Sequence, residues 1–283
     1  TSCSPVITAA ETSSPVAPGP QELKTPIPAE QTTPEPVSTQ PPQPTPSDGC
    51  LYAGGEVTRT YFRSGLMEYP YEVSIYLPPC YGSFTDVRYP VLYLIHGQNQ
   101  DDTFWLSLGV KELADRRIAN GAPPFLMVMP REIKNFDPVT ETKFPDSIIQ
   151  ELIPWVEEKY MVCTTRDCRA VGGISRGGGW AIRLAMRNFD TFGSVGAHSM
   201  GLMEGDWWQA QKHLETRTPE EYPRIWIDQG EEDGLIVDTE FFVRILKSHG
   251  IPYEYHVNRG NHDVKYWKAH VDEYLDWYIQ GWR

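Results

Sequence analysis

Residues 173–177 read Gly-Ile-Ser-Arg-Gly and lie where an apolar run gives way to a helical pattern. A G-x-S-x-G turn in this context holds serine on a sharp strand-to-helix bend, from which the hydroxyl projects beyond the sheet. Nucleotide folds also use glycine-rich strand–helix turns, but neither G-x-G-x-x-G nor G-x-x-x-x-G-K-[ST] occurs in the chain. The pattern therefore predicts Ser175 as a catalytic nucleophile.

A serine nucleophile needs a base, and the base needs an acid that orients it. On a G-x-S-x-G architecture the acid and then the histidine follow the serine along the chain, at the ends of later strands. Asp233 comes just after one predicted strand, and His262 comes just after the next. We predict the triad Ser175, Asp233 and His262, with Glu232 and Asp238 as alternative acids.

The loop His96-Gly97-Gln98 follows the predicted strand 91–95. Such a loop is expected to direct a backbone N–H toward the oxyanion of a tetrahedral intermediate. We assign the two oxyanion donors to the N–H groups of Gln98 and Arg176, each typically worth roughly 3–4 kcal/mol in the transition state. The interpretation favoured for His96 is structural support of this loop.

Strand and helix patterns alternate through the region that must position these groups. Short apolar runs rich in β-branched and aromatic residues predict strands at 71–77, 91–95, 125–129, 169–173, 193–197, 224–229 and 253–257. Helical patterns lie at 110–119, 146–160, 176–188, 237–249 and 264–278, and Pro154 is expected to bend or break the second of them. The nearly continuous apolar character of the runs favours strands that are covered on both faces. The alternation predicts one α/β domain with a mostly parallel sheet and helices on both faces.

The composition of the chain argues against nucleic-acid binding and against a membrane-spanning helix. The 283 residues include 38 Asp plus Glu against 25 Lys plus Arg, a formal charge of −13. So acidic a chain repels phosphate backbones, and we expect no nucleic-acid partner. No apolar run approaches the roughly 18–20 residues that a membrane helix needs.

Residues 1–49 differ from the rest of the chain. They hold 12 of the 25 prolines and no aromatic residue, and all nine tryptophans follow Cys50. Such a segment cannot bury enough apolar surface to offset its ordering entropy, so we predict a disordered tether at 1–49 and a catalytic domain at 50–283. Thr1-Ser2-Cys3 resembles the start of a bacterial lipoprotein, with Cys3 as the lipid attachment site. A plain export linker and a cytosolic tail are the alternatives.

With Cys3 set aside, four cysteines remain and permit three pairings. Cys163 and Cys168 flank a short polar turn that brings them within disulfide range, and Cys50 and Cys80 then pair by elimination. Disulfides indicate an oxidising compartment, whereas buried free thiols would indicate a cytosolic enzyme. Zinc is disfavoured because no close Cys–His cluster occurs.

Taken together, these segments resemble the putative-esterase branch of the α/β-hydrolases. That branch includes feruloyl, acetyl-xylan and enterochelin esterases and S-formylglutathione hydrolases. The resemblance spans residues 55–283 and is carried by 89–97, 151–157, Gly-Gly-Ile-Ser-Arg-Gly-Gly at 172–178, 190–193, 230–233 and Gly-Asn-His-Asp at 260–263. It implies an α/β-hydrolase fold with an eight-stranded sheet, the triad Ser175, Asp233 and His262, and no cofactor.

Two features depart from the branch. The residue after the nucleophile is commonly Met or Leu there, but here it is Arg176, whose guanidinium could bind a substrate carboxylate or an internal acid. Residues 199–222 form a variable stretch in which Trp207 and Trp208 could line a substrate pocket or pack the stretch onto the core. Trp105 and Gln98 are further candidates for the pocket lining.

Three functions compete. The favoured one is an exported carboxylesterase whose partner is a small-molecule or polysaccharide-linked ester, with feruloyl or acetyl groups of plant polysaccharide foremost. The alternative with the same triad is a siderophore esterase of the enterochelin type, which Arg176 would favour by attracting an anionic substrate. The third is a catalytically inactive binding protein on an esterase fold, which would be marked by loss of a triad residue.

Overall fold

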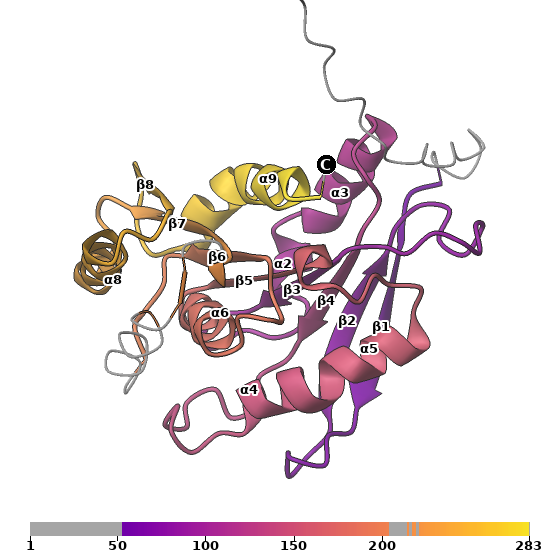
Figure 1. Cartoon of the computed structure of the whole chain (residues 1–283), viewed down its shortest axis with the longest axis horizontal. Helices are drawn as coiled ribbons and strands as arrows, with labels where there is room; N and C mark the ends of the chain where they lie inside the picture. Colours follow the sequence, from indigo (N-terminus) through magenta and orange to yellow (C-terminus); the bar gives the residue numbers. More distant parts are fainter. Residues whose placement is uncertain (1–52, 204–213, 215–216, 219–220, 283) are drawn as a thin grey trace, which may run out of the picture. The chain divides into compact units, whose positions relative to one another are not determined.

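Figure 1 shows the computed structural model of the chain, which describes residues 53–203, 214, 217–218 and 221–282. All the described residues belong to one compact unit, Pro44–Arg283. The tether predicted at 1–49 therefore lies outside the described residues. So do Cys3, Cys50, Trp207 and Trp208.

The described residues form one eight-stranded sheet in the order β1-β2-β4-β3-β5-β6-β7-β8. Its strands are β1 Glu56–Phe62, β2 Tyr71–Leu77, β3 Val91–Ile95, β4 Leu126–Pro130, β5 Arg169–Ile174, β6 Ser194–His198, β7 Arg224–Gly230 and β8 Glu254–Asn258. The β1–β2 and β2–β4 pairs are antiparallel, and all other neighbours are parallel. The prediction of a mostly parallel sheet in an α/β-hydrolase fold is confirmed, and β1 is a strand that the sequence analysis did not predict.

Helices cover both faces of this sheet (Figure 1). They are α2 Phe104–Ser107, α3 Val110–Ala119, α4 Phe144–Ser147, α5 Ile153–Lys159, α6 Arg176–Arg187, α8 Ile236–Ser248 and α9 Val264–Gln280, with a 3₁₀ turn η2 at Arg166–Cys168. Side chains alternate along the strands, so that Tyr93 and Ile95 pack into the core beneath α4, α5, α6 and α8, while Leu92 and Leu94 pack beneath α2, α3 and α9. None of the helices that the structure describes has the length and apolar character needed to cross a membrane.

The bend expected at Pro154 takes the form of a π-helical turn. Residues Ile148–Leu152, labelled η1, join α4 to α5 in this wider geometry, and Pro154 stands at the start of α5. Backbone angles stay helical through Leu152 and Ile153, so Pro154 lies within a continuous helical segment, and the wider turn before it accommodates the proline ring and its missing N–H. The single helix predicted at 146–160 is thus divided into three segments.

Candidate active site

Ser175 occupies a tight turn between β5 and α6, one residue beyond the strand. Its φ is +57°, a conformation that L-residues rarely adopt and that costs of order 1–3 kcal/mol. The flanking glycines allow this turn: a Cβ on Gly173 would lie 2.0 Å from the carbonyl oxygen of Gly177, and a Cβ on Gly177 would lie 2.2 Å from that of Ile95. The Ser175 N–H donates to the carbonyl of His198 at 2.8 Å, which ties the turn to β6.

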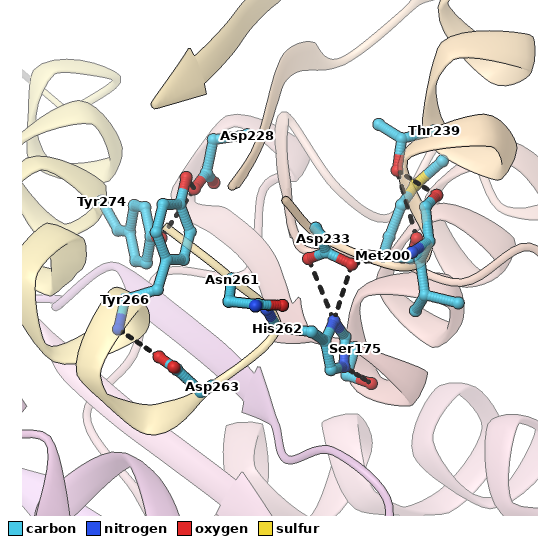
Figure 2. Close-up of polar contacts among 11 residues, drawn as sticks. Ser175, Met200, Asp228, Asp233, Thr239, Asn261, His262, Asp263, Tyr266 and Tyr274 are labelled. Atoms are coloured by element: carbon cyan, nitrogen blue, oxygen red, sulfur yellow. Dashed lines mark hydrogen bonds and ion pairs between the residues drawn. The ribbon is translucent and has the colours of Figure 1, made fainter. Parts of the chain in front are cut away.

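The structure brings the three predicted triad residues together (Figure 2). His262 Nε2 lies 2.9 Å from Ser175 Oγ, and His262 Nδ1 lies 3.0 Å from each carboxylate oxygen of Asp233. The Asp233 side chain is fully buried in the turn after β7, whereas the His262 side chain, in the loop after β8, is 29% exposed. In this arrangement Nδ1–H donates to the carboxylate, and Nε2 is left to accept the serine proton.

The environment keeps Asp233 ionised. Burial alone would raise its pKa, but hydrogen bonds from His262 and from the Leu235 N–H outweigh burial and hold the pKa of Asp233 below its usual value. The Leu235 N–H donates to Asp233 Oδ1 at 2.8 Å. Of the three acids considered, Asp233 is the one bonded to His262, while Glu232 is exposed on the same turn.

One predicted oxyanion donor, Gln98, lies in the loop after β3, and the other, Arg176, is the first residue of α6. The neighbouring Gly97 N–H is already bound by the Gln100 side chain at 2.8 Å. Within the part of the chain that the structure describes, no acceptor takes the N–H of Gln98 or of Arg176. Both groups therefore remain available to bind a developing negative charge.

His96 braces the loop that carries Gln98. It is 1% exposed, its Nδ1 donates to the Gly97 carbonyl at 2.7 Å, and its Nε2 accepts from the Glu132 N–H at 2.9 Å. Burial lowers the pKa of His96, which favours the neutral ring that this pattern requires. The geometry agrees with the supporting role expected from the sequence.

The Arg176 guanidinium binds an internal acid. It makes a two-pronged contact with Glu132, at 2.8 Å from Nε and 2.6 Å from Nη2, and Glu132 also accepts from the indole N–H of Trp180 at 2.9 Å. The Glu132 side chain is 1% exposed and that of Arg176 is 14% exposed. Because the guanidinium charge is compensated by a buried carboxylate, little of it remains for an anionic substrate.

The prediction that Trp105 lines the pocket is wrong. Its side chain is 1% exposed, its indole N–H donates to the Ile95 carbonyl at 3.2 Å, and its ring packs edge-on against His198. The chain enters α2 behind β3, so this tryptophan fills the core on the α9 side. Trp207 and Trp208 lie outside the described residues, and the side chain of Gln98, the remaining candidate, donates from Nε2 to the Asn135 carbonyl at 3.3 Å.

Two of the four predicted disulfide cysteines are seen bonded to each other, Cys163 to Cys168. Cys80 is also disulfide-bonded, and Cys50, its predicted partner, lies outside the described residues.

A second carboxylate–imidazole pair was missed by the sequence analysis. His198 and Asp228 are register partners on β6 and β7, and His198 Nδ1 lies 2.6 Å from Asp228 Oδ1. Tyr266 and Tyr274 of α9 donate their hydroxyls to Asp228 Oδ2 at 2.8 and 2.7 Å (Figure 2). The available signal was a polar residue near the C-terminal end of each of two apolar strand patterns.

Comparison with known proteins places this geometry in context. A family model described as "Putative esterase" matches residues 64–278. Among curated proteins, an endo-1,4-beta-xylanase/feruloyl esterase of Xylanibacter ruminicola is 28% identical over 212 residues, covering 71% of this chain and 28% of that protein. An acetyl esterase of Caldicellulosiruptor saccharolyticus is 22% identical over 220 residues, covering 66% of this chain and 82% of that protein. The chain thus spans less than a third of the xylanase/feruloyl esterase that it matches.

Among solved structures, a ferulic acid esterase superposes with a TM-score of 0.72 at 24% identity, covering 81% of this chain and 99% of that one. At this level of identity the likeness establishes the shared fold.

Proposed function

We propose a substrate and a mechanism from one premise: the chain belongs to the putative esterase family and is a serine-type hydrolase of carboxylic esters. The substrates we propose are feruloyl or acetyl esters carried by plant polysaccharide. The similarity to a protein named for both xylanase and feruloyl esterase activity supports this class. The observation that carries the mechanism is the continuous hydrogen-bond chain from Ser175 through His262 to Asp233.

In the proposed reaction, Ser175 Oγ attacks the ester carbonyl carbon while His262 Nε2 takes the hydroxyl proton. The carbonyl oxygen becomes an oxyanion and is bound by the N–H groups of Gln98 and Arg176. The tetrahedral intermediate then collapses, the C–O bond to the alcohol breaks, and His262 donates its proton to the leaving oxygen.

Water completes the cycle. It attacks the acyl-enzyme and gives a proton to His262, and the second collapse releases the carboxylic acid and returns the proton to Ser175 Oγ. Asp233 orients the imidazole and stabilises its charged form in both halves of the reaction. No step requires a cofactor.

We also propose an exported setting, because the Cys163–Cys168 disulfide is of a kind that persists in oxidising compartments. In this setting residues 1–49 would act as a tether, and Cys3 would be its lipid attachment site. Mass measurement of the N-terminal peptide from the native host would detect the lipid, and an unmodified Cys3 would remove the anchor from the proposal.

The siderophore alternative loses the feature that favoured it, because Arg176 is paired with Glu132. An ester panel tests the proposal against it: p-nitrophenyl acetate, methyl ferulate, acetylated xylan and a catecholate trilactone, each with wild type and Ser175→Ala. We expect hydrolysis of the acetyl or feruloyl esters by wild type only. Preference for the trilactone would replace the substrate class, and equal rates in the two proteins would exclude Ser175 as the nucleophile.

A further inference from the structure

Glu132, just beyond the end of β4, is bonded to both elements that carry the proposed oxyanion donors. Its backbone N–H donates to Nε2 of His96, in the loop after β3, at 2.9 Å. Its carboxylate accepts from the Arg176 guanidinium, at the start of α6, at 2.8 and 2.6 Å. The Glu132 side chain is 1% exposed, so little water competes for these bonds. One buried residue therefore links the loop after β3 to α6.

The bond to His96 leads to the peptide group between Gly97 and Gln98. Because Nε2 accepts from Glu132, Nδ1 carries the ring proton and donates it to the Gly97 carbonyl at 2.7 Å. A trans peptide group is planar, with its C=O and N–H pointing in opposite directions. With the carbonyl held by His96, the Gln98 N–H is fixed on the other side of this peptide. The loop also lies against the nucleophile, since a Cβ on Gly97 would be 3.3 Å from Ser175 Cβ.

The carboxylate of Glu132 holds the first turn of α6. Arg176 and Trp180 are four residues apart, so their side chains lie on the same face of the helix. Both donate to Glu132, Arg176 through two nitrogens and Trp180 through its indole N–H at 2.9 Å. A two-pronged bond fixes orientation as well as distance. The position of the Arg176 N–H relative to the end of β4 is thereby set.

The loop that starts at Glu132 also contacts the side chains of both donor residues. Gln98 Nε2 donates to the Asn135 carbonyl, and Arg176 Nη2 donates to the Asp137 carbonyl, each at 3.3 Å. In the sheet, β3 lies between β4 and β5, so the end of β4 is not a strand neighbour of the nucleophile turn. These side-chain contacts, together with those of Glu132, connect the segment after β4 to the proposed hole.

We propose that Glu132 is a positioning residue that holds the N–H groups of Gln98 and Arg176 at the spacing required by the transition state. It acts through His96 and Arg176 and contacts no reacting atom. The inference rests on the proposed function, because the oxyanion forms in that reaction. Oxyanion donors must lie about 2.7–3.1 Å from the charged oxygen, and a misplacement of about 1 Å can slow a reaction about 10²-fold.

A similar ion pair at the far end of β5 provides a matched control. Arg169 begins β5, whereas Ser175 follows its end, and Arg169 Nε lies 2.7 Å from Glu157 Oε1. The two side chains are 11% and 22% exposed. Their bond joins α5 to the start of β5, away from the loops around Ser175. Loss of this pair should affect stability without moving the oxyanion donors.

The test uses three variants of the full-length protein. Glu132→Gln removes the charge, and Glu157→Gln makes the same change in the control pair. Because Glu132→Gln leaves the Arg176 guanidinium without a counter-charge, the double variant Glu132→Gln/Arg176→Met is included. The double variant contains no unpaired buried charge, its glutamine can still accept from Trp180, and the backbone N–H of residue 176 is retained. Near-UV circular dichroism and urea unfolding monitor the fold.

Two measurements report on the oxyanion hole. The first is kcat and KM with p-nitrophenyl acetate. The second is the inhibition constant of phenyl trifluoromethyl ketone, whose carbonyl carbon is attacked by Ser175 Oγ while the hydroxyl proton moves to His262. This adduct places an oxyanion in the hole, so its affinity depends on the two donors and serves as a transition-state analogue.

We expect kcat to fall at least about tenfold in Glu132→Gln and in the double variant, with KM changed less than about twofold, because the oxyanion exists only in the transition state. The inhibition constant should rise by the same factor as kcat falls. In Glu157→Gln both constants should match those of wild type.

Unchanged kcat in folded Glu132→Gln or in the folded double variant would overturn the inference. So would a fall in kcat with an unchanged inhibition constant, or an equal fall in Glu157→Gln. A double variant that does not fold would show that the pair is required for the fold itself and would also overturn it. Wild-type protein that neither hydrolyses the ester nor binds the ketone would instead contradict the proposed function.

Discussion

Among the residues that the structure describes, two hydrogen-bond chains link a carboxylate through an imidazole to a hydroxyl, and they differ in exposure and in position relative to their strands. In one, Asp233 and His262 lead to Ser175, with contacts of 3.0 and 2.9 Å. In the other, Asp228 and His198 lead to Tyr278, with contacts of 2.6 and 3.1 Å. Hydrogen-bond connectivity alone therefore does not identify the catalytic set.

Access separates the two. The His262 side chain is 29% exposed, whereas the side chains of His198 and Asp228 are fully buried beneath α9. Position separates them as well, because Asp233 and His262 follow their strands while Asp228 and His198 lie within theirs. A substrate can reach only the first chain.

The terminal hydroxyls differ too. Ser175 sits on a strained turn next to two free N–H groups, whereas the Tyr278 hydroxyl is so closely packed that a Cβ on Gly172 or Gly196 would lie within about 2 Å of it. Burial raises the pKa of Tyr278 well above its usual value, so its proton is held more firmly than that of an exposed tyrosine. The buried set of hydrogen bonds connects α9 to the sheet, and we propose that the exposed set carries the chemistry.

The largest contrast should come from removing each terminal hydroxyl. Ser175→Ala should lower kcat for p-nitrophenyl acetate by up to about 10⁶-fold, because the nucleophile is lost. Tyr278→Phe should leave kcat nearly unchanged and lower the free energy of unfolding by about 1 kcal/mol, since only the bond to His198 disappears. Steady-state kinetics gives kcat and urea unfolding gives the stability of each variant. A comparable loss of kcat in the two would contradict the assignment of catalysis to Ser175 alone.

The second largest effect is expected at Asp233, the carboxylate of the exposed hydrogen-bond chain. Asp233→Asn should reduce kcat about 10⁴-fold, because the amide favours the wrong tautomer of His262. Glu232→Gln, one residue away and exposed, serves as the matched control and should retain activity. Equal losses in the two variants would show that general charge on this turn, rather than the Asp233 contact, supports the reaction.

Substitution of Asp228, the carboxylate of the buried hydrogen-bond chain, should lower stability rather than activity. Asp228 accepts from four side chains, which are His198, Trp226, Tyr266 and Tyr274. Asp228→Asn leaves some of these donors unpaired and should lower the free energy of unfolding by about 3 kcal/mol or more in urea titrations. If it abolished turnover without loss of stability, Asp228 would belong to the chemistry.

His96 extends the comparison to a buried histidine with no carboxylate bonded to its ring. Burial lowers the pKa of His96 below its usual value of 6.5. Between pH 6.5 and the lower folded pKa, the unfolded chain binds a proton that the folded protein does not. The stability contributed by neutral His96 is therefore complete above pH 6.5 and is lost as the pH falls through this window.

His96→Gln should remove this component of the pH dependence. The difference in slope between wild type and variant, from urea unfolding at several pH values below 6.5, should approach about 1.4 kcal/mol per pH unit. Identical slopes would mean that His96 takes up a proton in the folded state.

Local patterns were enough to predict much of the fold and the nucleophile turn. The glycines around Ser175 are enough to predict its tight turn, and short apolar runs are enough to predict β3, β5 and β7. Strand β1 was missed because most of its side chains are at least partly exposed at the edge of the sheet and its sequence mixes charged and apolar residues.

Long-range partners could not be predicted from local sequence. The bond from Arg176 to Glu132 joins residues 44 positions apart, and His198 meets Asp228 only because β6 and β7 pair in one register. Trp105 shows the same limit, because its spacing from the oxyanion loop did not reveal which way α2 turns. Which residues share a site depends on how the strands pair, and only the folded chain shows this.

Reaction with a fluorophosphonate, followed by peptide mass spectrometry, tests most directly which of the two chains is catalytic. We predict a single adduct on Ser175 in wild type, none in Ser175→Ala, and much slower labelling in His262→Ala, which has lost the base. Folded, active protein with the adduct on another residue, or with none, would contradict the assignment of Ser175, His262 and Asp233 as the catalytic triad.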